Sequence, residues 1–439
     1  MKRLLGYIAI LVFFLLLIDG ILPQAQIFLF SGIVIIKNIA LKAILVLCLT
    51  GCLLVHLLKT GKITWIRKII IPYSLFLSYL AVHLWLFKNS YPLDYLLFSY
   101  NAYYFFLLMF PIAAYVSLNM GFFNKLILYI SVPLLSIGLL QFLLNEPILP
   151  LTSADDYFRV ISWEYYEGKI RAFSLFSSGL NYGQFLSLIG AFAACHVYRK
   201  RALGRVAALM VLLAVSIAVY TTLTRNIYIQ YLFTVLTAFL LVRGTTPGVR
   251  PRVEASGFVI VLPFLYTLLS ALLVFGVQLF LLVYLHNPVL MNEETLNSRL
   301  LAWVSYFPLW TKNGLFQFLF GAGLFQGREE FIIVDQVLID NNFLAVGLHI
   351  GLIGLLLWAF LMWRIWKWML CVAFRQSENV MVLAIVSIWA TWLSSGLFNV
   401  TLSLYPMLAM ILLPISLEWK SSLQRNTRTK SLLQPAVEA

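Results

Sequence analysis

Apolar stretches long enough to cross a lipid bilayer recur along the whole chain, and they constrain its fold more than any other feature. A spanning helix needs about 20 mostly apolar residues. Twelve stretches approach this length, which predicts twelve membrane-spanning helices. The predicted spans are residues 4–18, 40–57, 69–86, 95–116, 126–144, 182–197, 206–223, 227–242, 258–284, 343–363, 380–397 and 404–417.

The composition excludes a soluble globular protein. Of the 439 residues, 62% are apolar and 11% are charged, whereas soluble domains have about 45–50% apolar and about 25% charged residues. A globule of this size needs a polar surface, so such an excess cannot be hidden in a core. We predict an all-α, polytopic transmembrane bundle, in which residues 1–418 form one membrane domain and residues 419–439 a flexible cytoplasmic tail.

The distribution of charge predicts the orientation. The formal net charge of +14 does not indicate a nucleic-acid partner, because the basic residues occur in short clusters between apolar stretches. With the N-terminus inside, 21 of the 31 basic residues but only 4 of the 17 acidic residues fall in cytoplasmic segments. We therefore expect both termini in the cytoplasm. No small-residue cleavage site follows residues 4–18, so we interpret this stretch as a retained first helix rather than a signal peptide.

Two predicted outer segments, about residues 145–180 and 286–342, are too long to be simple connections. Both are rich in aromatic and charged residues, and this aromatic content argues against disorder. We expect these segments, the second of them partly helical, to pack on the outer membrane surface and to present polar groups there.

No metal or cofactor site is predicted. The cysteines are Cys48, Cys52, Cys195 and Cys371, and no cluster of acidic residues accompanies them, so packing is the simpler explanation. The chain has no P-loop, HExxH or G-x-S-x-G motif. ATP-driven transport and hydrolase chemistry therefore lack support.

Ionisable groups near bilayer depth are costly, so arginines at the outer ends of spans are candidate functional residues. Arg171 precedes a span that opens with Asn181, and Arg225 follows Thr224 at the tight turn between two spans. Simpler interpretations are a helix cap at Ser178 or Asn181 and a snorkelling arginine at a turn. The threonines and the asparagine around Arg225, on the side where positive charge is disfavoured, favour a functional role.

Two further places lie in and after the second outer segment. Arg299 is followed at i+4 by Trp303, which could stack on the guanidinium; the alternative is an amphipathic surface helix with one charge. Asp340, Asn341 and Asn342 open a hydrophobic span, either as a cap or as the lining of a cavity at the membrane surface.

Together these groups suggest a site for a lipid diphosphate on the outer face. Guanidinium groups pair bidentately with phosphate, and a carboxylate with nearby carboxamides could orient or deprotonate a hydroxyl. A lipid-diphosphate donor needs no ATP, because its leaving group is already activated.

In three places the chain resembles the O-antigen ligase and Wzy polymerase superfamily of bacterial polysaccharide assembly. The segment from Arg171 to Asn181 is similar to the family's Arg-bearing segment before a central span, and Thr224-Arg225 to its Ser/Thr-Arg turn. The third and most specific is a block similar to the family's Arg-x-x-x-Trp, Gly-x-Gly, His-Asn-x-x-Leu and Gly-x-x-Gly motifs. In this chain that block reads Arg299 to Trp303, Gly321-Ala-Gly323, Asp340-Asn341-Asn342-Phe343-Leu344 and Gly351-Leu-Ile-Gly354.

The sequence departs from the family pattern in ways that affect the expected function. Where ligases have a histidine before the asparagine, this chain has Asp340, an arrangement more usual among repeat-unit polymerases. This favours a polymerase over a ligase and leaves the identity of the base open. His349 replaces a residue that is often acidic in the family, and no glycine follows Arg225.

The resemblance implies a metal-independent glycosyltransferase of the C type, with no cofactor, in the bacterial inner membrane. It implies an undecaprenyl-diphosphate-linked glycan as donor, used on the periplasmic face, with membrane lipid and a chain-length regulator as candidate partners. Arg225 and Arg299 would neutralise the diphosphate, with Asp340 as base or acceptor-orienting group and Asn341 positioning the acceptor. Substrate contacts would come from the remaining candidates, Arg171, Asn181, Trp303 and Asn342.

Two alternatives to a repeat-unit polymerase stay open from the sequence. One is a ligase that moves the finished glycan to a lipid or protein acceptor. The other, a non-enzyme, is a transporter of the lipid-linked oligosaccharide. A transporter should line a central path with polar groups at mid-membrane depth, whereas here the strongest polar clusters cap spans on one side.

Overall fold

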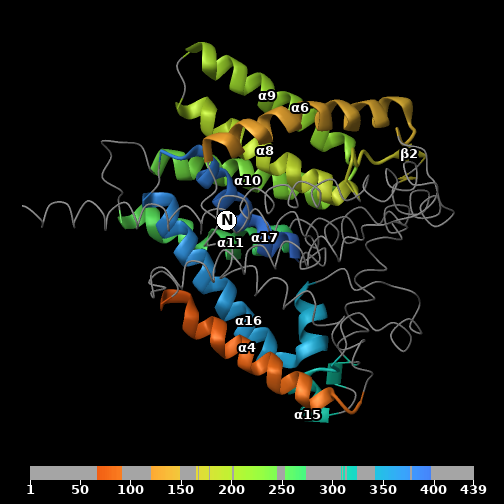
Figure 1. Ribbon diagram of the computed structural model, residues 1–439, viewed down its shortest axis with the longest axis vertical. Coiled ribbons are helices and arrows are strands. Elements are labelled where there is room, and N and C mark those ends of the chain that lie inside the picture. Colours follow the sequence, from red (N-terminus) through yellow and green to blue (C-terminus); the bar gives the residue numbers. More distant parts are fainter. Residues whose placement is uncertain are drawn as a thin grey trace, which may run out of the picture.

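The computed structural model describes residues 67–90, 120–148, 165–166, 168–176, 178–199, 202–244, 253–272, 308, 310–311, 314–323, 342–375 and 378–396. These residues are mostly helical (Figure 1). The helices are α4 (Arg67–Phe87), α6 (Met120–Leu144), α8 (Gly179–Arg199), α9 (Ala202–Thr221), α10 (Arg225–Gly244), α11 (Val253–Ala271), α15 (Gly314–Phe320), α16 (Asn342–Arg375) and α17 (Val380–Gly396). One antiparallel hairpin joins β1 (Tyr165–Tyr166) to β2 (Lys169–Ile170).

The described residues confirm helices at eight of the predicted spans. The spans predicted between residues 69 and 86 and from residue 126 to residue 397 fall on α4, α6, α8, α9, α10, α11, α16 and α17, although residues 273–284 of the span 258–284 lie outside the described part. A break between the spans 206–223 and 227–242 is also confirmed, but it lies at residues 222–224, because α9 ends at Thr221 and α10 begins at Arg225. The predicted spans 4–18, 40–57, 95–116 and 404–417 lie outside the described residues, so the total of twelve stays a prediction.

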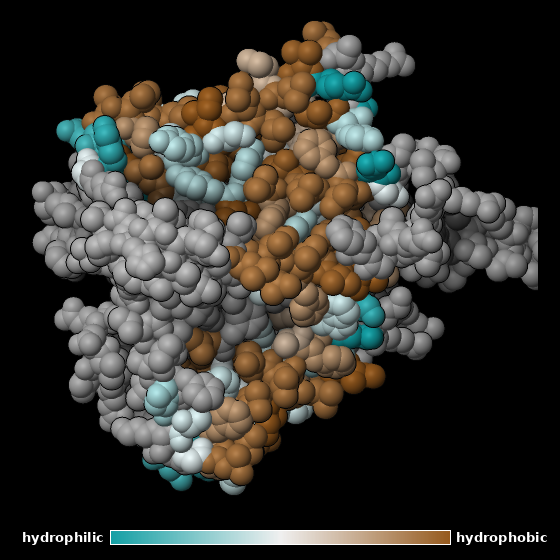
Figure 2. Space-filling view, turned by 180° about the vertical axis from the view of Figure 1, so that it is seen from behind, coloured by the Kyte–Doolittle hydropathy of each residue, from teal (hydrophilic) through white to brown (hydrophobic). Residues whose placement is uncertain are grey.

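Three of the described helices are long and apolar enough to cross a membrane: Leu203–Thr221, Asn226–Gly244 and Val346–Cys371. Shorter apolar helical stretches are Ile71–Phe87, Tyr129–Leu144, Val259–Ser270 and Val380–Thr391. The distribution of exposure agrees with a lipid environment. Leu203 and Met210 of α9 are 87% and 62% exposed, and hydrophobic side chains cover much of the described surface in Figure 2. These features are compatible with a membrane protein.

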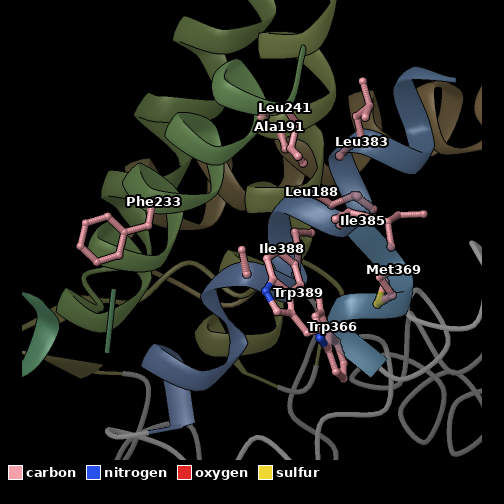
Figure 3. Close-up of a cluster of buried hydrophobic side chains, with 14 of the residues drawn as sticks. Leu188, Ala191, Phe233, Leu241, Trp366, Met369, Leu383, Ile385, Ile388 and Trp389 are labelled. Atoms are coloured by element: carbon pink, nitrogen blue, oxygen red, sulfur yellow. The ribbon is translucent and has the colours of Figure 1, made fainter. Parts of the chain in front are cut away.

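Helix α8 occupies the centre of the described bundle. It is buried on all sides from Asn181 to Cys195 and packs against α9, α10 and α17. Figure 3 shows part of the resulting cluster, in which Leu241 of α10 lies beside Ala191 of α8, and Leu188 of α8 lies beside Ile385 of α17. Since the connections from α8 to α9 and from α9 to α10 are short, α8 and α10 run in the same direction.

Hydrogen bonds between hydroxyl groups join the central helices. The Thr234 and Thr391 hydroxyls lie 3.0 Å apart between α10 and α17. Those of Thr237 and Tyr266 lie 2.8 Å apart between α10 and α11. Threonine pairs of this kind commonly stabilise helix packing in lipid, where apolar contact alone adds little.

Small residues let α8 approach its neighbours closely. A Cβ atom at Gly183 would overlap the side chain of Ile227, and one at Gly190 would overlap the ring of Tyr231. The Tyr231 hydroxyl is held by that of Ser216 at 2.8 Å. The ring therefore cannot move away from α8 without losing this bond.

We predict that Gly190→Ala lowers the free energy of unfolding by about 1–3 kcal/mol, because the added methyl group overpacks the interface and displaces Tyr231. Reversible unfolding in detergent measures the change. Gly244→Ala is the matched control, since a Cβ atom there meets nothing within 4 Å. Equal stability of the two variants would contradict this description of the α8 interface.

Candidate functional site

The described part of residues 145–180, the first predicted outer segment, is bonded to the end of α6. The carboxamide of Asn145 donates to the Gly168 carbonyl at 3.0 Å and accepts from the Ile170 N–H at 2.8 Å. The buried carboxamide of Gln141 donates to the Ser174 carbonyl at 2.9 Å and accepts from the Phe173 and Ser174 N–H groups at 3.2 and 2.7 Å. Two carboxamide side chains therefore fix residues 168–174.

The same segment meets the turn between α9 and α10. The Ala172 N–H donates to the Thr221 carbonyl at 2.9 Å. Arg171 is half-buried at this junction, and Arg225 follows Thr221 by four residues. The structure therefore brings together two of the arginine-bearing segments that the sequence singles out, although they are about 50 residues apart in the chain.

The threonines near Arg225 shape the turn. The hydroxyl groups of Thr221 and Thr222 donate to the carbonyls of Ala218 and Val219, each at 2.7 Å. The Thr224 hydroxyl donates to the Thr222 carbonyl at 2.8 Å. Leu223 between them has a φ of 46°, which lets the chain reverse over three residues. These hydroxyl groups thus bond to the backbone at the turn.

Arg225 is the first residue of α10, and its side chain lies outside the described part of the chain. Its backbone position is informative, because the first turn of a helix presents N–H groups and a partial positive charge. An anion at this end of α10 would be stabilised by the helix as well as by the guanidinium.

The start of α8 confirms one of the two predicted caps. The Ser178 hydroxyl accepts from the Asn181 N–H at 3.3 Å, and α8 begins at Gly179. Ser178 is therefore the N-cap residue. Asn181 lies in the first turn and is 7% exposed. Since α8 and α10 run in parallel, Asn181 and Arg225 lie at the same end of the bundle.

Two buried glutamines near this end were not singled out by sequence reasoning. Gln184 of α8 and Gln230 of α10 are 2% and 1% exposed. Neither carboxamide has a hydrogen-bond partner within the part of the chain that the structure describes. Each is a lone glutamine inside a predicted apolar span, and this pattern could have identified them. A search for ionisable groups does not select them, because a carboxamide carries no charge.

The structure places only part of the third motif block. Arg299, Trp303, Asp340 and Asn341 lie outside the described residues, and of Asn342 the structure describes only its place as the first residue of α16. The position of the candidate base relative to the arginines therefore stays a prediction. Among the described residues, no group of three or more metal-binding side chains occurs.

Two glycines of the third motif block, Gly351 and Gly354, lie close to other segments of the chain. A Cβ atom at Gly351 would overlap the backbone of Leu319 and Phe320, and one at Gly354 would overlap the ring of Tyr79. Gly351 and Gly354 therefore allow close packing, as small residues commonly do between membrane helices.

We predict that replacing two buried glutamines, Gln141 and Gln230, has different effects on the free energy of unfolding. Gln141→Leu should lower the free energy of unfolding by about 2–3 kcal/mol, because it leaves two buried N–H groups and a carbonyl without their partner. Gln230→Leu should leave stability unchanged or raised, since it removes a buried amide with no bond to lose among the described residues. Thermal unfolding in nanodiscs measures both. Similar losses in the two variants would contradict the assigned bonds of Gln141.

No family model matches the chain, and no curated protein matches it. The resemblance in sequence motifs and the geometry above are therefore the two lines of support for a functional assignment.

Proposed function

We propose that the protein is a glycosyltransferase that polymerises a lipid-linked glycan repeat on the outer face of the bacterial inner membrane. The observation that carries this proposal is the bond between Ala172 and Thr221, which joins the Arg171 segment to the Arg225 turn at the starts of α8 and α10. Two arginines and two helix N-termini at one end of a membrane bundle suit an anionic substrate.

The donor is an undecaprenyl-diphosphate-linked oligosaccharide. Arg225 and Arg299 pair with its diphosphate, and Arg171 gives a third contact. Guanidinium groups fit phosphate oxygens bidentately, and their effect is larger near the membrane, where less water screens the charge. Because negative charge grows on the diphosphate as the glycosidic bond breaks, these contacts strengthen in the transition state and accelerate the reaction.

The transfer step joins two lipid-linked repeats. A sugar hydroxyl of the acceptor forms a bond to the anomeric carbon of the donor, while the bond from that carbon to the diphosphate oxygen breaks. The leaving undecaprenyl diphosphate takes the electron pair. Asp340 receives or orients the hydroxyl proton, Asn341 positions the acceptor, and Asn181, Trp303 and Asn342 contact the glycan. The step uses no metal ion or cofactor.

The polar residues of α10 bear on the transporter alternative. Gln230, Thr234 and Thr237 lie on one face of this helix, as a transport path would require. However, the Thr234 and Thr237 hydroxyls are buried and bonded to Thr391 and Tyr266. These contacts suit packing between helices better than a hydrated path. A ligase would use the same donor site with a different acceptor.

We predict that Arg225→Ala and Arg299→Ala each lower the rate of polymer formation by about a hundredfold or more, the usual effect of removing one group that stabilises transition-state charge. The lysine variants should fall between alanine and wild type, since lysine keeps the charge but not the fork of donors. Polymer formed from the lipid-linked repeat is measured in nanodiscs.

Arg243→Ala is the control for this experiment. Arg243 is exposed at the opposite end of α10, so its loss should leave the rate unchanged while altering net charge equally. Normal polymer from the Arg225→Ala and Arg299→Ala variants, at equal membrane expression, would remove the support for a diphosphate site.

A further inference from the structure

Helix α16 is interrupted within its membrane-spanning part. Gly351 has φ 71° and ψ −178°, a conformation outside the helical range, and the helix continues beyond it to Arg375. The break falls inside the stretch Val346–Cys371, which is long and apolar enough to span a membrane. A break inside a stretch that crosses lipid frees carbonyl groups that lipid cannot satisfy.

Three consecutive carbonyls at the break find partners from other segments. The Ala322 N–H donates to the Leu348 carbonyl at 2.6 Å, and the Gly323 N–H donates to the His349 carbonyl at 3.0 Å. The Tyr79 hydroxyl donates to the Ile350 carbonyl at 2.5 Å. The carbonyl groups at the break are therefore satisfied by two backbone N–H groups of the chain after α15 and by one side chain of α4.

A second side chain of α4 holds the end of α15. The Nε2 atom of His83 is hydrogen-bonded to the Phe320 carbonyl. A carbonyl can only accept, so this nitrogen carries the proton. The His83 ring also lies edge-on to the fully buried His349 ring, with centroids 6.1 Å apart. One histidine thus contacts both sides of the junction.

These α4 residues share one face of the helix. Tyr79, His83 and Phe87 are four residues apart, so they lie above one another along α4. Tyr79 covers Gly354, and Phe87 covers Gly323, because a Cβ atom at either glycine would overlap the ring above it. Figure 1 shows α4 beside α16, with α15 at the end of α4. We call these contacts the α4 clamp.

The α4 clamp holds the break at Gly351 and with it the first part of α16, which begins at Asn342. In the proposed function Asn342 contacts the glycan, and the candidate base Asp340 and its neighbour Asn341 directly precede it in the sequence. An error of about 1 Å in the position of a catalytic group can reduce a rate by about a hundredfold.

We propose that Tyr79 and His83 are positioning residues for the glycosyl transfer, acting through the interrupted helix α16. This inference rests on the proposed function for its effect on rate, whereas the clamp itself can be tested without it. Neither residue contacts the substrate. Their hydrogen bonds to Ile350 and Phe320 keep the 321–323 segment against the break. This holds the first part of α16, which Asp340 and Asn341 directly precede in the sequence.

The test compares variants that differ in one hydrogen bond. Tyr79→Phe removes only the hydroxyl group. His83→Phe keeps an aromatic ring but removes the N–H donor, and His83→Gln restores an N–H donor at a similar reach. Val82→Ala is the control, because the Val82 side chain on α4 is 54% exposed. Initial rates of polymer formation in nanodiscs give kcat and KM for the lipid-linked donor.

We expect Tyr79→Phe and His83→Phe to lower kcat by about tenfold to a hundredfold while KM for the donor changes less than about twofold. His83→Gln should recover most of kcat, and Val82→Ala should equal wild type. Unchanged kcat in Tyr79→Phe and His83→Phe, or His83→Gln no better than His83→Phe, would overturn the positioning role.

Hydrogen–deuterium exchange of the peptide containing Ala322 and Gly323 tests the α4 clamp independently of activity. Both amides should be protected in wild type and exchange faster in Tyr79→Phe and His83→Phe. If wild type forms no polymer, the proposed function fails, and this exchange alone decides the clamp. Equal protection in all variants would show that Tyr79 and His83 do not hold the junction.

Discussion

In lipid, every backbone N–H and C=O group must find a partner inside the protein, and the described structure depends on this constraint. Regular helices satisfy it locally. The places where helices stop are the places where specific side chains appear: Gln141 bonds the segment after β2, the threonines bond the carbonyls of the α9–α10 turn, and Tyr79 bonds the broken part of α16. At these three places buried polar side chains lie where the backbone needs hydrogen-bond partners.

This constraint also explains two junctions between segments of the described structure. One is the junction of residues 168–176 with the α9–α10 turn, which brings the Arg171 and Arg225 segments together at the starts of α8 and α10. The other is the junction of α15, α16 and α4 around Gly351. The first supplies cationic groups suited to a diphosphate. The second holds the first part of α16, whose first residue, Asn342, follows Asp340 by two positions in the sequence. The proposed chemistry requires both to be rigid.

Much of the fold could be predicted from local patterns, because apolar length, turns and caps are encoded locally. Helices are found at eight of the predicted spans, a break close to Arg225 was expected, and Ser178 caps α8 as one of two predicted options. The extension of α16 to Arg375 and its interruption at Gly351 were not predicted. The roles of Gln141 and His83 were also missed, since their partners lie 33 and 237 residues away in the chain. No local pattern specifies such contacts.

The central claim is that the protein joins lipid-linked repeats at a site on the outer membrane face. The most direct test gives the purified protein in nanodiscs only the lipid-linked repeat unit and analyses the products by size. The account predicts a ladder spaced by one repeat, formed without ATP, added metal or another acceptor. A protein that forms no ladder, while a known polymerase does so under the same conditions, would contradict it. Transfer that appears only when a lipid or protein acceptor is added would identify a ligase instead.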